Sequence, residues 1–215
     1  MRSIEDNYLR AIFEGSYLKK GISNKQLSEL LKITPASTTE FTQKLHKQGL
    51  VDGGKYKKVS LSEKGQQKAQ KIMHKFRLCE VLLEKCFNLS LAEVVQQAWL
   101  LADFSSETLL HELNEKLGRP KKTFFGAEVQ EPKVFNSDLE MLSSVKTGNV
   151  VILREYLGSK NMVIYFSELA LNLNEELKVE KYDHDFNLFV LTTFNSKKIM
   201  VSKEVADFIY VEIKK

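Results

Sequence analysis

The chain has 215 residues, of which 43% are hydrophobic and 28% are charged, an ordinary balance for a soluble globular protein. It contains no apolar run as long as a membrane span needs, and its first residues lack the apolar core of a secretion signal. Its two cysteines, Cys79 and Cys86, form no CxxC pair, so neither a disulfide scaffold nor a zinc knuckle is indicated. We therefore expect a cytoplasmic protein of one large or two small domains.

The net charge of +4 is distributed unevenly along the chain. Residues 1–80 contain 16 Lys and Arg against 8 Asp and Glu, a balance of +8, and the remaining 135 residues carry a balance of −4. A basic half beside an acidic half indicates that the first half meets a polyanion. Because lysine-rich surfaces also occur without such a partner, the charge becomes informative only together with a binding motif.

Three helices are expected near the amino terminus. Residues 4–19 place apolar side chains on one helical face. Ser23 and, three residues later, Gln26 form a capping box for a second helix. Thr34 and Pro35 begin a third helix, since Thr caps helices and Pro is tolerated at the first helical position. Two short helices joined by a tight turn predict a helix-turn-helix.

A lysine-rich hairpin is expected between Leu50 and Leu61. Gly49 ends the third helix, and the pair Gly53-Gly54 supplies the turn of the hairpin. Three lysines lie beside this turn: Lys55, Lys57 and Lys58. The hairpin makes the predicted motif a winged helix-turn-helix.

Further helices are expected after the hairpin. Ser62 caps a long helix that reaches about residue 87, because apolar side chains recur there at steps of three and four residues. Helices over residues 91–102 and 106–117 follow, and Gly118 and Pro120 end the second of them. We expect the apolar faces of these three helices to form a dimer interface.

The carboxy-terminal part changes from a helical pattern to a strand pattern. Residues 118–145 combine Gly and Pro with few periodic apolar side chains, which is typical of a linker. A short helix is expected over residues 166–171 and a helical turn over 203–208. Strands are expected over residues 149–157, 162–166, 177–183, 188–194, 198–202 and 210–214. Short strands at this spacing predict a small barrel.

This order of parts resembles the diphtheria-toxin-repressor and manganese-transport-regulator family of bacterial metalloregulators. The resembling stretches are EDNYLRAIF, NKQLSELLKITPASTTEFTQKLHKQGLV, VSLSEKG, HKFRLCEVLLEKCF and HELNEKLGRPK. The strand-rich end is similar to the SH3-like domain, related to the ferrous-transport accessory protein, that longer members carry. The resemblance implies an α+β fold with a winged-helix DNA-binding domain (1–62), a helical dimerisation domain (63–120), a linker (121–145) and an SH3-like domain (146–215).

The resemblance also points to DNA contacts at the start of the third helix, because the matching positions in the family contact DNA. The alternative is that these short hydroxyl side chains only cap the helix, although hydroxyls also bond base edges and phosphates. Hairpin lysines of a winged motif touch phosphate or the minor groove. The predicted DNA-contacting residues are Ser23, Lys25, Pro35, Ala36, Ser37, Thr38, Thr39, Gln43, Lys44, Lys55, Lys57 and Lys58.

The family's divalent-metal site is not reproduced in this chain. The matching positions hold Asn7, Arg10, Phe76, Trp99, Ala102 and Asp103, and Glu80 survives from the ancillary set. Octahedral Mn²⁺ or Fe²⁺ needs several carboxylate or imidazole donors, of which Asp103 is the remaining one at these positions. We therefore expect no Mn or Fe cofactor at the family site. We hypothesise that a salt bridge from Arg10 to Asp103 or Glu80 replaces the ion and locks one conformation.

Other signals allow alternatives. Cys79 and Cys86 lie seven residues apart on one helical face, either as core cysteines or, if Cys86 is exposed, as a thiol switch or ligands of another metal or haem. Trp99 either fills the core or lines an apolar cavity for an organic effector. No ligand spacing relates the four histidines, which are His46, His74, His111 and His184.

The sequence as a whole predicts a homodimeric winged-helix transcription regulator, more specifically a repressor. Its partners would be a second copy and a pseudo-palindromic site in double-stranded DNA, with no membrane partner. No nucleophile–base pair, glycine-rich phosphate loop or acid pair stands out, so an enzyme is not expected. The alternatives are a metal- or redox-responsive regulator with a non-standard site, and a protein-interaction module that binds no DNA.

Overall fold

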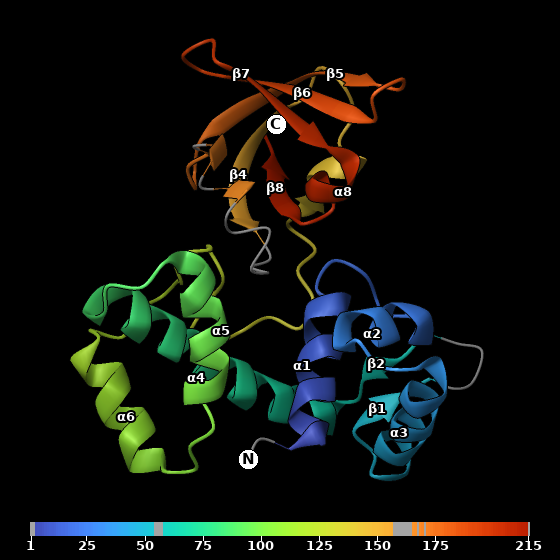
Figure 1. The fold of residues 1–215 in the computed structure, drawn as a ribbon, viewed down its shortest axis with the longest axis vertical. Helices are drawn as coiled ribbons and strands as arrows, with labels where there is room; N and C mark the ends of the chain where they lie inside the picture. The colour runs from blue at the N-terminus through green and yellow to red at the C-terminus, as the bar shows by residue number, and fades with distance from the viewer. Residues whose placement is uncertain (1–2, 54–57, 157–164, 167, 170, 215) are drawn as a thin grey trace. The chain divides into compact units, whose positions relative to one another are not determined.

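The computed structural model describes residues 3–214, apart from 54–57, 157–164, 167 and 170. The chain divides into two compact units. The first comprises Met1–Leu82, Ala98–Lys121 and Glu128–Asn136, and the second comprises Leu83–Gln97, Lys122–Ala127 and Ser137–Lys215. The fold class is α+β, as predicted, with helices in the first unit and an antiparallel sheet in the second (Figure 1).

The first unit follows the predicted order of elements. Its helices and strands are α1 (Ile4–Ser16), α2 (Asn24–Leu31), α3 (Pro35–Lys47), β1 (Val51–Asp52), β2 (Ser60–Leu61), the first part of α4 (Glu63–Cys86), the end of α5 (Leu91–Leu101) and α6 (Glu107–Lys116). The first helix ends at Ser16, three residues before the predicted end. No helix in the described part of the chain is long and apolar enough to cross a membrane.

The predicted helix starts are confirmed. Ser23 caps α2 in a capping box with Gln26, since the Gln26 amide donates to the Ser23 hydroxyl and the Gln26 side chain accepts from the Ser23 amide. Thr34 caps α3, whose first residue is Pro35. The Ser62 hydroxyl accepts from the Gly65 amide at 3.1 Å at the start of α4. These local signals fix where each helix begins.

The helix-turn-helix packs on α1 and on the hairpin. Leu9, Ile12 and Phe13 of α1 and Leu27 of α2 are fully buried, as is Leu45 of α3. Strands β1 and β2 pair antiparallel, with Val51 opposite Leu61. Two backbone hydrogen bonds of 2.8 Å join Ile22 and Val59, so the hairpin is also tied to the segment that precedes α2. The hairpin is therefore held by its own strand pairing and by the segment that precedes α2.

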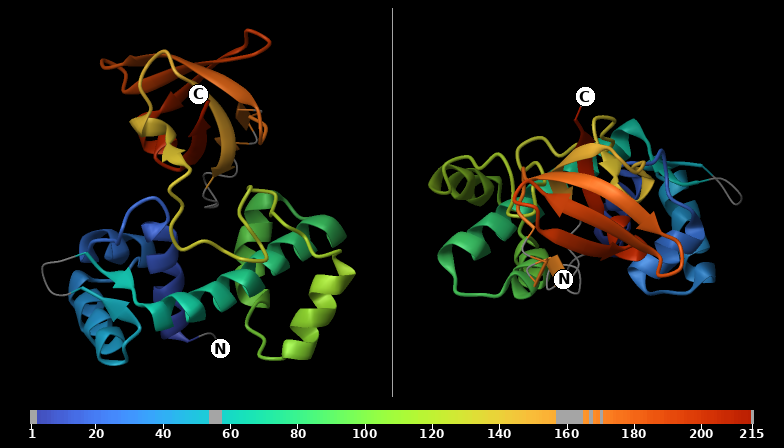
Figure 2. Two further views of the ribbon diagram at one scale, coloured as in Figure 1. Left: turned by 180° about the vertical axis from the view of Figure 1, so that it is seen from behind. Right: turned by 90° about the horizontal axis from the view of Figure 1, so that it is seen from above.

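The second unit is built on a six-stranded antiparallel sheet of order β3-β8-β4-β5-β6-β7. Figure 2 shows the long strands β5, β6 and β7 side by side. The elements are β3 (Glu140–Met141), the 3-10 helix η1 (Leu142–Ser144), β4 (Val150–Tyr156), β5 (Glu176–Asp183), β6 (Leu188–Thr193), β7 (Lys198–Ser202), α8 (Lys203–Ala206) and β8 (Ile209–Ile213). The helical turn predicted over 203–208 is confirmed as α8.

One predicted strand was wrong where the structure describes it. Residues 162–166 were expected to be a strand; 162–164 lie outside the described residues, and Tyr165 and Phe166 are helical. Phe166 is buried, and its ring centroid lies 4.3 Å from that of Tyr156 at the end of β4. The alternation of polar and apolar residues is too short there to separate one helical turn from a strand. The helix predicted over 166–171 includes the helical residues Phe166, Glu168 and Leu169.

The stretch predicted as a linker, 121–145, carries buried side chains. Phe125 belongs to the core of the second unit, where its backbone oxygen accepts from the Tyr156 amide at 3.1 Å. Val129 is fully buried against Leu78 and Val81 of α4 in the first unit. The buried apolar residues of this stretch lie singly in irregular backbone rather than on the face of a helix or strand. They therefore show no periodicity in the sequence.

Candidate nucleic-acid interface

The first turn of α3 presents small neutral side chains at the protein surface. Pro35, Ala36 and Ser37 are exposed. The Ser37 hydroxyl lies 2.9 Å from the hydroxyl of the capping residue Thr34, and Thr39 is half-buried. Small polar groups at the start of an exposed helix allow close approach to base edges in a major groove.

Thr38 does not share this exposure, and its inclusion among the predicted DNA contacts is corrected. Its side chain is 0% exposed, and its hydroxyl donates to the Thr34 carbonyl at 3.0 Å. Thr38 points inward because it lies seven residues before Leu45, on the same face of the helix. It is a packing residue of the helix-turn-helix.

Tyr8 fixes the start of α3 against α1. Its ring stacks on that of Phe41 with centroids 4.4 Å apart, and its hydroxyl donates to the Ser37 carbonyl at 3.3 Å. Burial raises the pKa of Tyr8, with a smaller contribution in the same direction from Glu40 and an opposing one from the Thr38 side chain. The hydroxyl therefore stays protonated at neutral pH and remains a donor, so α1 and α3 are positioned together.

The remaining predicted contacts lie on three elements. Ser23 is half-buried and occupied in capping α2, whereas Lys25 is exposed on that helix. Gln43 and Lys44 are exposed on α3, and Lys58 is exposed on the hairpin. Lys55 and Lys57 lie outside the described residues. The exposed cations therefore flank the first turn of α3 on both sides in sequence.

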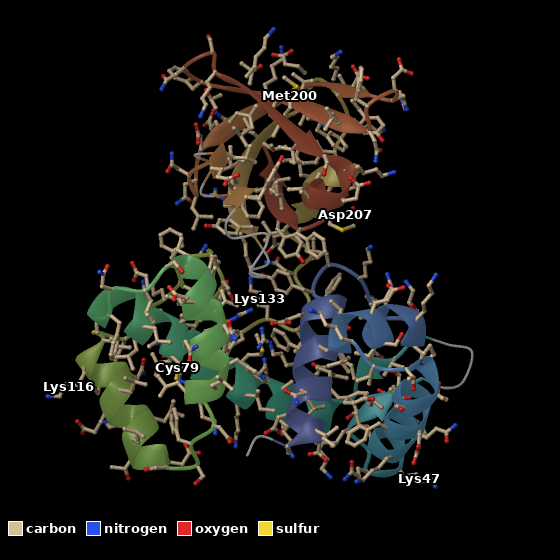
Figure 3. The ribbon with its side chains drawn as sticks, viewed as in Figure 1. Lys47, Cys79, Lys116, Lys133, Met200 and Asp207 are labelled. Atoms are coloured by element: carbon tan, nitrogen blue, oxygen red, sulfur yellow. The ribbon has the colours of Figure 1, made fainter. Side chains whose placement is uncertain are left out.

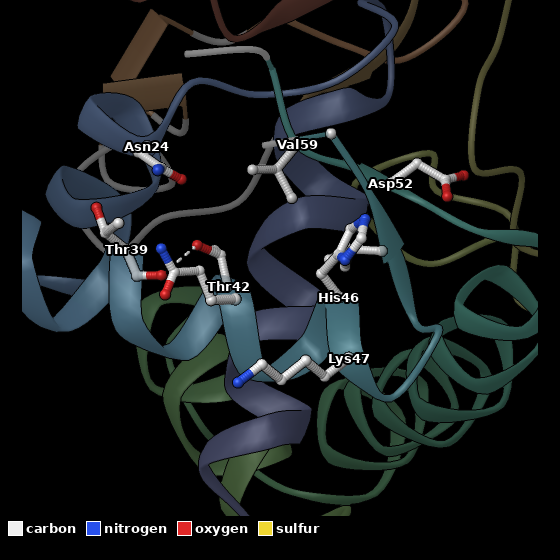
Figure 4. A pocket seen from close by; sticks show the side chains of 10 residues that line it. Asn24, Thr39, Thr42, His46, Lys47, Asp52 and Val59 are labelled. Carbon is white, nitrogen blue, oxygen red and sulfur yellow. Dashed lines mark hydrogen bonds between the residues drawn. The ribbon is translucent and has the colours of Figure 1, made fainter. Parts of the chain in front are cut away.

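Sequence reasoning missed a small pocket between α3 and the hairpin. The pocket has a volume of about 250 Å³, and its lining includes Asn24, Gln43, Lys47 and Val59 (Figure 4). The Asn24 side-chain oxygen is buried without a hydrogen-bond partner within the part of the chain that the structure describes. Lys47 is exposed at the surface of α3 (Figure 3). Lys47 lies four residues after the predicted DNA contact Gln43, on the same helical face, so the sequence also placed it beside the predicted contacts.

A second group of side chains joins α1 to α4 and α5. The Arg10 guanidinium carbon lies 4.1 Å from the ring centroid of Phe76 and 4.2 Å from that of Trp99. The two rings meet edge to face, with centroids 5.3 Å apart and planes at 87°. The indole N–H of Trp99 donates to the Asn7 side-chain oxygen at 3.1 Å. Asn7, Arg10, Phe76 and Trp99 are called the Arg10 cluster below.

Arg10 forms an ion pair within its own helix. The Arg10 Nε donates to Glu14 Oε1 at 2.8 Å, one helical turn further along α1. Asp103, two residues after the end of α5, is exposed, and Glu80 is buried on α4. The pairing of Arg10 with Asp103 or Glu80 stays a hypothesis. Glu14 lies outside the positions matched to metal ligands, but its spacing of four residues from Arg10 is that of an ion pair along one helix.

The two models of one protein family match consecutive parts of the chain. The iron dependent repressor N-terminal DNA-binding domain matches residues 1–59, and the iron dependent repressor metal-binding and dimerisation domain matches residues 62–129. The chain belongs to the iron-dependent repressor family. Its members are DNA-binding transcriptional regulators and not enzymes.

Related proteins agree with this membership. The chain is 31% identical over 115 residues to an uncharacterised HTH-type transcriptional regulator of Methanocaldococcus jannaschii, a match that covers 52% of this chain and 90% of that protein. The solved structure of the manganese regulator SloR is 26% identical, covers all of both chains and gives a TM-score of 0.83. The IdeR of T. acidophilum shares the fold over the full length of both chains, with 17% identity and a TM-score of 0.82.

The six positions matched to the family's metal ligands offer few donors for a divalent cation. The Asn7 oxygen, a possible ligand, accepts the Trp99 indole N–H, and Arg10 brings a positive charge among the same side chains. The rings of Phe76 and Trp99 offer no lone pair to Mn²⁺ or Fe²⁺. Ala102, which is buried, has no donor either. Four of the six positions therefore form a cluster whose chemistry is that of a cation–π contact.

The cysteines and His74 differ in their surroundings. Cys79, labelled in Figure 3, is fully buried in α4. Cys86, in the last turn of the same helix, is exposed. Neither of the two cysteines forms a disulfide. The shared helical face predicted for them does not give equal burial, because Cys86 lies where the helix ends. His74 has a packing role, with Nδ1 2.7 Å from the Val129 carbonyl oxygen.

Proposed function

We propose that this protein is a transcriptional repressor that binds a pseudo-palindromic DNA site as a homodimer and works without Mn²⁺ or Fe²⁺ at the family's metal position. The observation that carries the DNA-binding part is the exposed face of α3. It combines the small first turn with Lys44, His46 and Lys47 in the last turn. Two such helices, one from each copy, would enter successive major grooves. Its place of action is the cytoplasm, where that DNA lies.

The second copy is expected to cover apolar side chains on α5 and α6. Leu100 is 65% exposed, Leu101 is 45% exposed and Leu109 is 50% exposed. Exposed large apolar side chains on neighbouring helices favour an interface, since their burial is worth roughly 25 cal/mol per Å² of apolar surface. We divide the chain accordingly into a winged-helix domain (1–62), a dimerisation domain (63–120), a connecting segment (121–145) and an SH3-like domain (146–215).

The absence of family-type metal control rests on the Arg10 cluster. A divalent ion would have to displace the Trp99–Asn7 hydrogen bond and lie beside a guanidinium. Few oxygen or nitrogen ligands would replace the water molecules that the ion loses on binding. The donor set thus supports a regulator that keeps the architecture of its family without its metal control.

DNA binding should depend steeply on salt and remain unchanged on chelation. A gel shift or anisotropy titration on the promoter of the protein's own gene should lose roughly 10³-fold or more in affinity between low and moderate salt, because lysines release counterions from phosphate. Added EDTA or MnCl₂ should leave the affinity within about twofold at fixed ionic strength. Affinity indifferent to salt would contradict the DNA-binding role, and binding that needs Mn²⁺ would contradict the metal-independent part alone.

A thiol-responsive regulator is the second candidate, favoured by the exposure of Cys86. Exposed thiols are open to oxidation and alkylation, whereas the buried thiol of Cys79 is shielded. Alkylation of the folded protein under non-denaturing conditions followed by the same titration separates the two. Unchanged affinity after complete modification of Cys86 would exclude the thiol response.

A further inference from the structure

We propose that the Arg10 guanidinium is a resident cation that ties α1 to α4 and α5 and thereby holds the DNA-reading helix in its binding arrangement. The proposal rests on the proposed function, whose regulation it specifies. It assigns a positioning role to a residue that the resemblance to the family matches to a metal-ligand position.

The geometry makes Arg10 a bridge between three helices. From α1, its guanidinium lies over the Phe76 ring of α4 and the Trp99 ring of α5, at 4.1 and 4.2 Å. A cation within about 6 Å of a ring centroid is attracted by the negative face of the ring, and tryptophan gives the strongest attraction. Arg10 therefore joins the same three elements that the matched metal positions occupy.

Partial burial strengthens these contacts. The side chains of Arg10 and Glu14 are each 18% exposed, and Phe76 is 3% exposed. Cation–π contacts gain strength when water is excluded, and salt screens partly buried charges less than exposed ones. The Glu14 carboxylate accepts from Arg10 Nε and balances the charge within the protein. The guanidinium is therefore held by the Glu14 carboxylate through Nε and lies within cation–π distance of two rings.

The indole of Trp99 makes a second tie to the same helix. Its N–H donates to the Asn7 oxygen, one turn before Arg10 on α1. The ring is thereby oriented for the guanidinium, because one edge is fixed by the hydrogen bond. Both contacts join α5 to α1, so losing Arg10 weakens this junction without removing it.

The position of α1 determines that of α3. Tyr8 lies between Asn7 and Arg10 in sequence, stacks on Phe41 and donates to the Ser37 carbonyl. A shift of α1 relative to α4 would therefore move the first turn of α3. In a dimer that reads two grooves at fixed spacing, such a shift lowers affinity even though Arg10 touches no DNA.

Variants of Arg10 in the full-length protein test the proposal. Arg10→Gln and Arg10→Ala remove the cation, and Arg10→Lys retains a charge without the planar stacking group. Arg119→Ala is the matched control, since Arg119 also makes an ion pair to a glutamate four residues away, Glu115, but is 69% exposed. The DNA probe is a labelled duplex from the promoter of the protein's own gene.

Arg10→Gln and Arg10→Ala should each bind the duplex about tenfold more weakly than the unchanged protein, which corresponds to about 1.4 kcal/mol. Arg10→Lys should recover part of the loss, and Arg119→Ala should bind like the unchanged protein. Trp99 is the single tryptophan of the chain, so its emission reports the cluster directly and without DNA. We expect a shifted emission in Arg10→Gln and Arg10→Ala, a smaller shift in Arg10→Lys and none in Arg119→Ala.

Two results would overturn the proposal. One is an Arg10→Gln variant that is folded, as its circular dichroism shows, and whose Trp99 emission and DNA affinity are both unchanged. The other is a rise in the DNA affinity of the unchanged protein on adding MnCl₂, accompanied by altered Trp99 emission. If Arg10→Ala fails to fold, Arg10→Gln and Arg10→Lys decide the question. Failure of the unchanged protein to bind any promoter duplex would overturn the proposed function, whereas the emission of Trp99 would still test the tie.

Discussion

Replacing Ser37 with glutamate is expected to reduce DNA affinity by about 100-fold, because a carboxylate at the exposed start of α3 would face phosphates and acceptor-rich base edges. Folding should survive the change. The first turn of α3, Pro35 to Thr38, consists of neutral residues, and an acidic side chain near a helix amino terminus is stabilising by about 0.3–1 kcal/mol. The measurement is an anisotropy titration with the promoter duplex beside a thermal melt.

Ser37→Gln is the matched control for this prediction. Glutamine has nearly the same shape as glutamate and carries no charge, so a loss of less than about tenfold isolates the electrostatic part. Equal weakening by both substitutions would mean that steric fit alone decides. Full affinity in Ser37→Glu, with an unchanged or raised melting temperature, would exclude the start of α3 from the DNA interface.

Replacing Gly65 with alanine is expected to destabilise the first unit by about 3 kcal/mol, although alanine is the better helix former by about 1 kcal/mol. A Cβ at Gly65 would lie 1.9 Å from the Leu50 backbone oxygen, which also accepts from the Ser62 amide. The start of α4 would have to move away from the hairpin. Urea unfolding followed by Trp99 emission, which reports the first unit, gives the change in midpoint.

Gly49→Ala separates this contact from backbone strain. Gly49 has φ +69°, and a Cβ built there meets no described atom within 4 Å. Its substitution should cost about 1–2 kcal/mol, the penalty of the left-handed region alone. A stabilised Gly65→Ala variant would show that helix propensity outweighs the contact and that α4 is not held against Leu50. A Gly49→Ala loss as large as that of Gly65→Ala would contradict the same assignment.

The helical part of the fold was predictable because its signals are local. Ser23, Thr34 and Ser62 each cap a helix through a hydrogen bond to an amide three residues on, and such spacings are visible in the sequence. The segment 121–145 and the turn at Phe166 were not predictable in this way. Their apolar side chains are buried by contacts distant in sequence, such as Val129 on Leu78 and Phe166 on Tyr156.

The candidate site, like the fold, was predictable from the sequence only in part. Exposure of Ser37 and burial of Thr38 follow from which face of α3 packs, and one residue of rotation separates an exposed side chain from a core side chain. That Arg10 lies among the matched metal positions was anticipated. The contacts of Arg10 with two rings required the three-dimensional arrangement, because they join helices that are far apart in the sequence. Its pairing with Glu14, four residues later on α1, has a spacing that is visible in the sequence.

The Arg10 cluster changes what such a regulator would measure in the cell. A bound ion leaves when its free concentration falls, and a side chain cannot dissociate. If Arg10 takes the place of the ion, its contacts with Phe76 of α4 and Trp99 of α5 form once, when the chain folds. Occupancy of the operator would then follow the number of protein copies per genome, through mass action on dimer and DNA. The quantity that sets repression would be the synthesis and degradation of the protein itself.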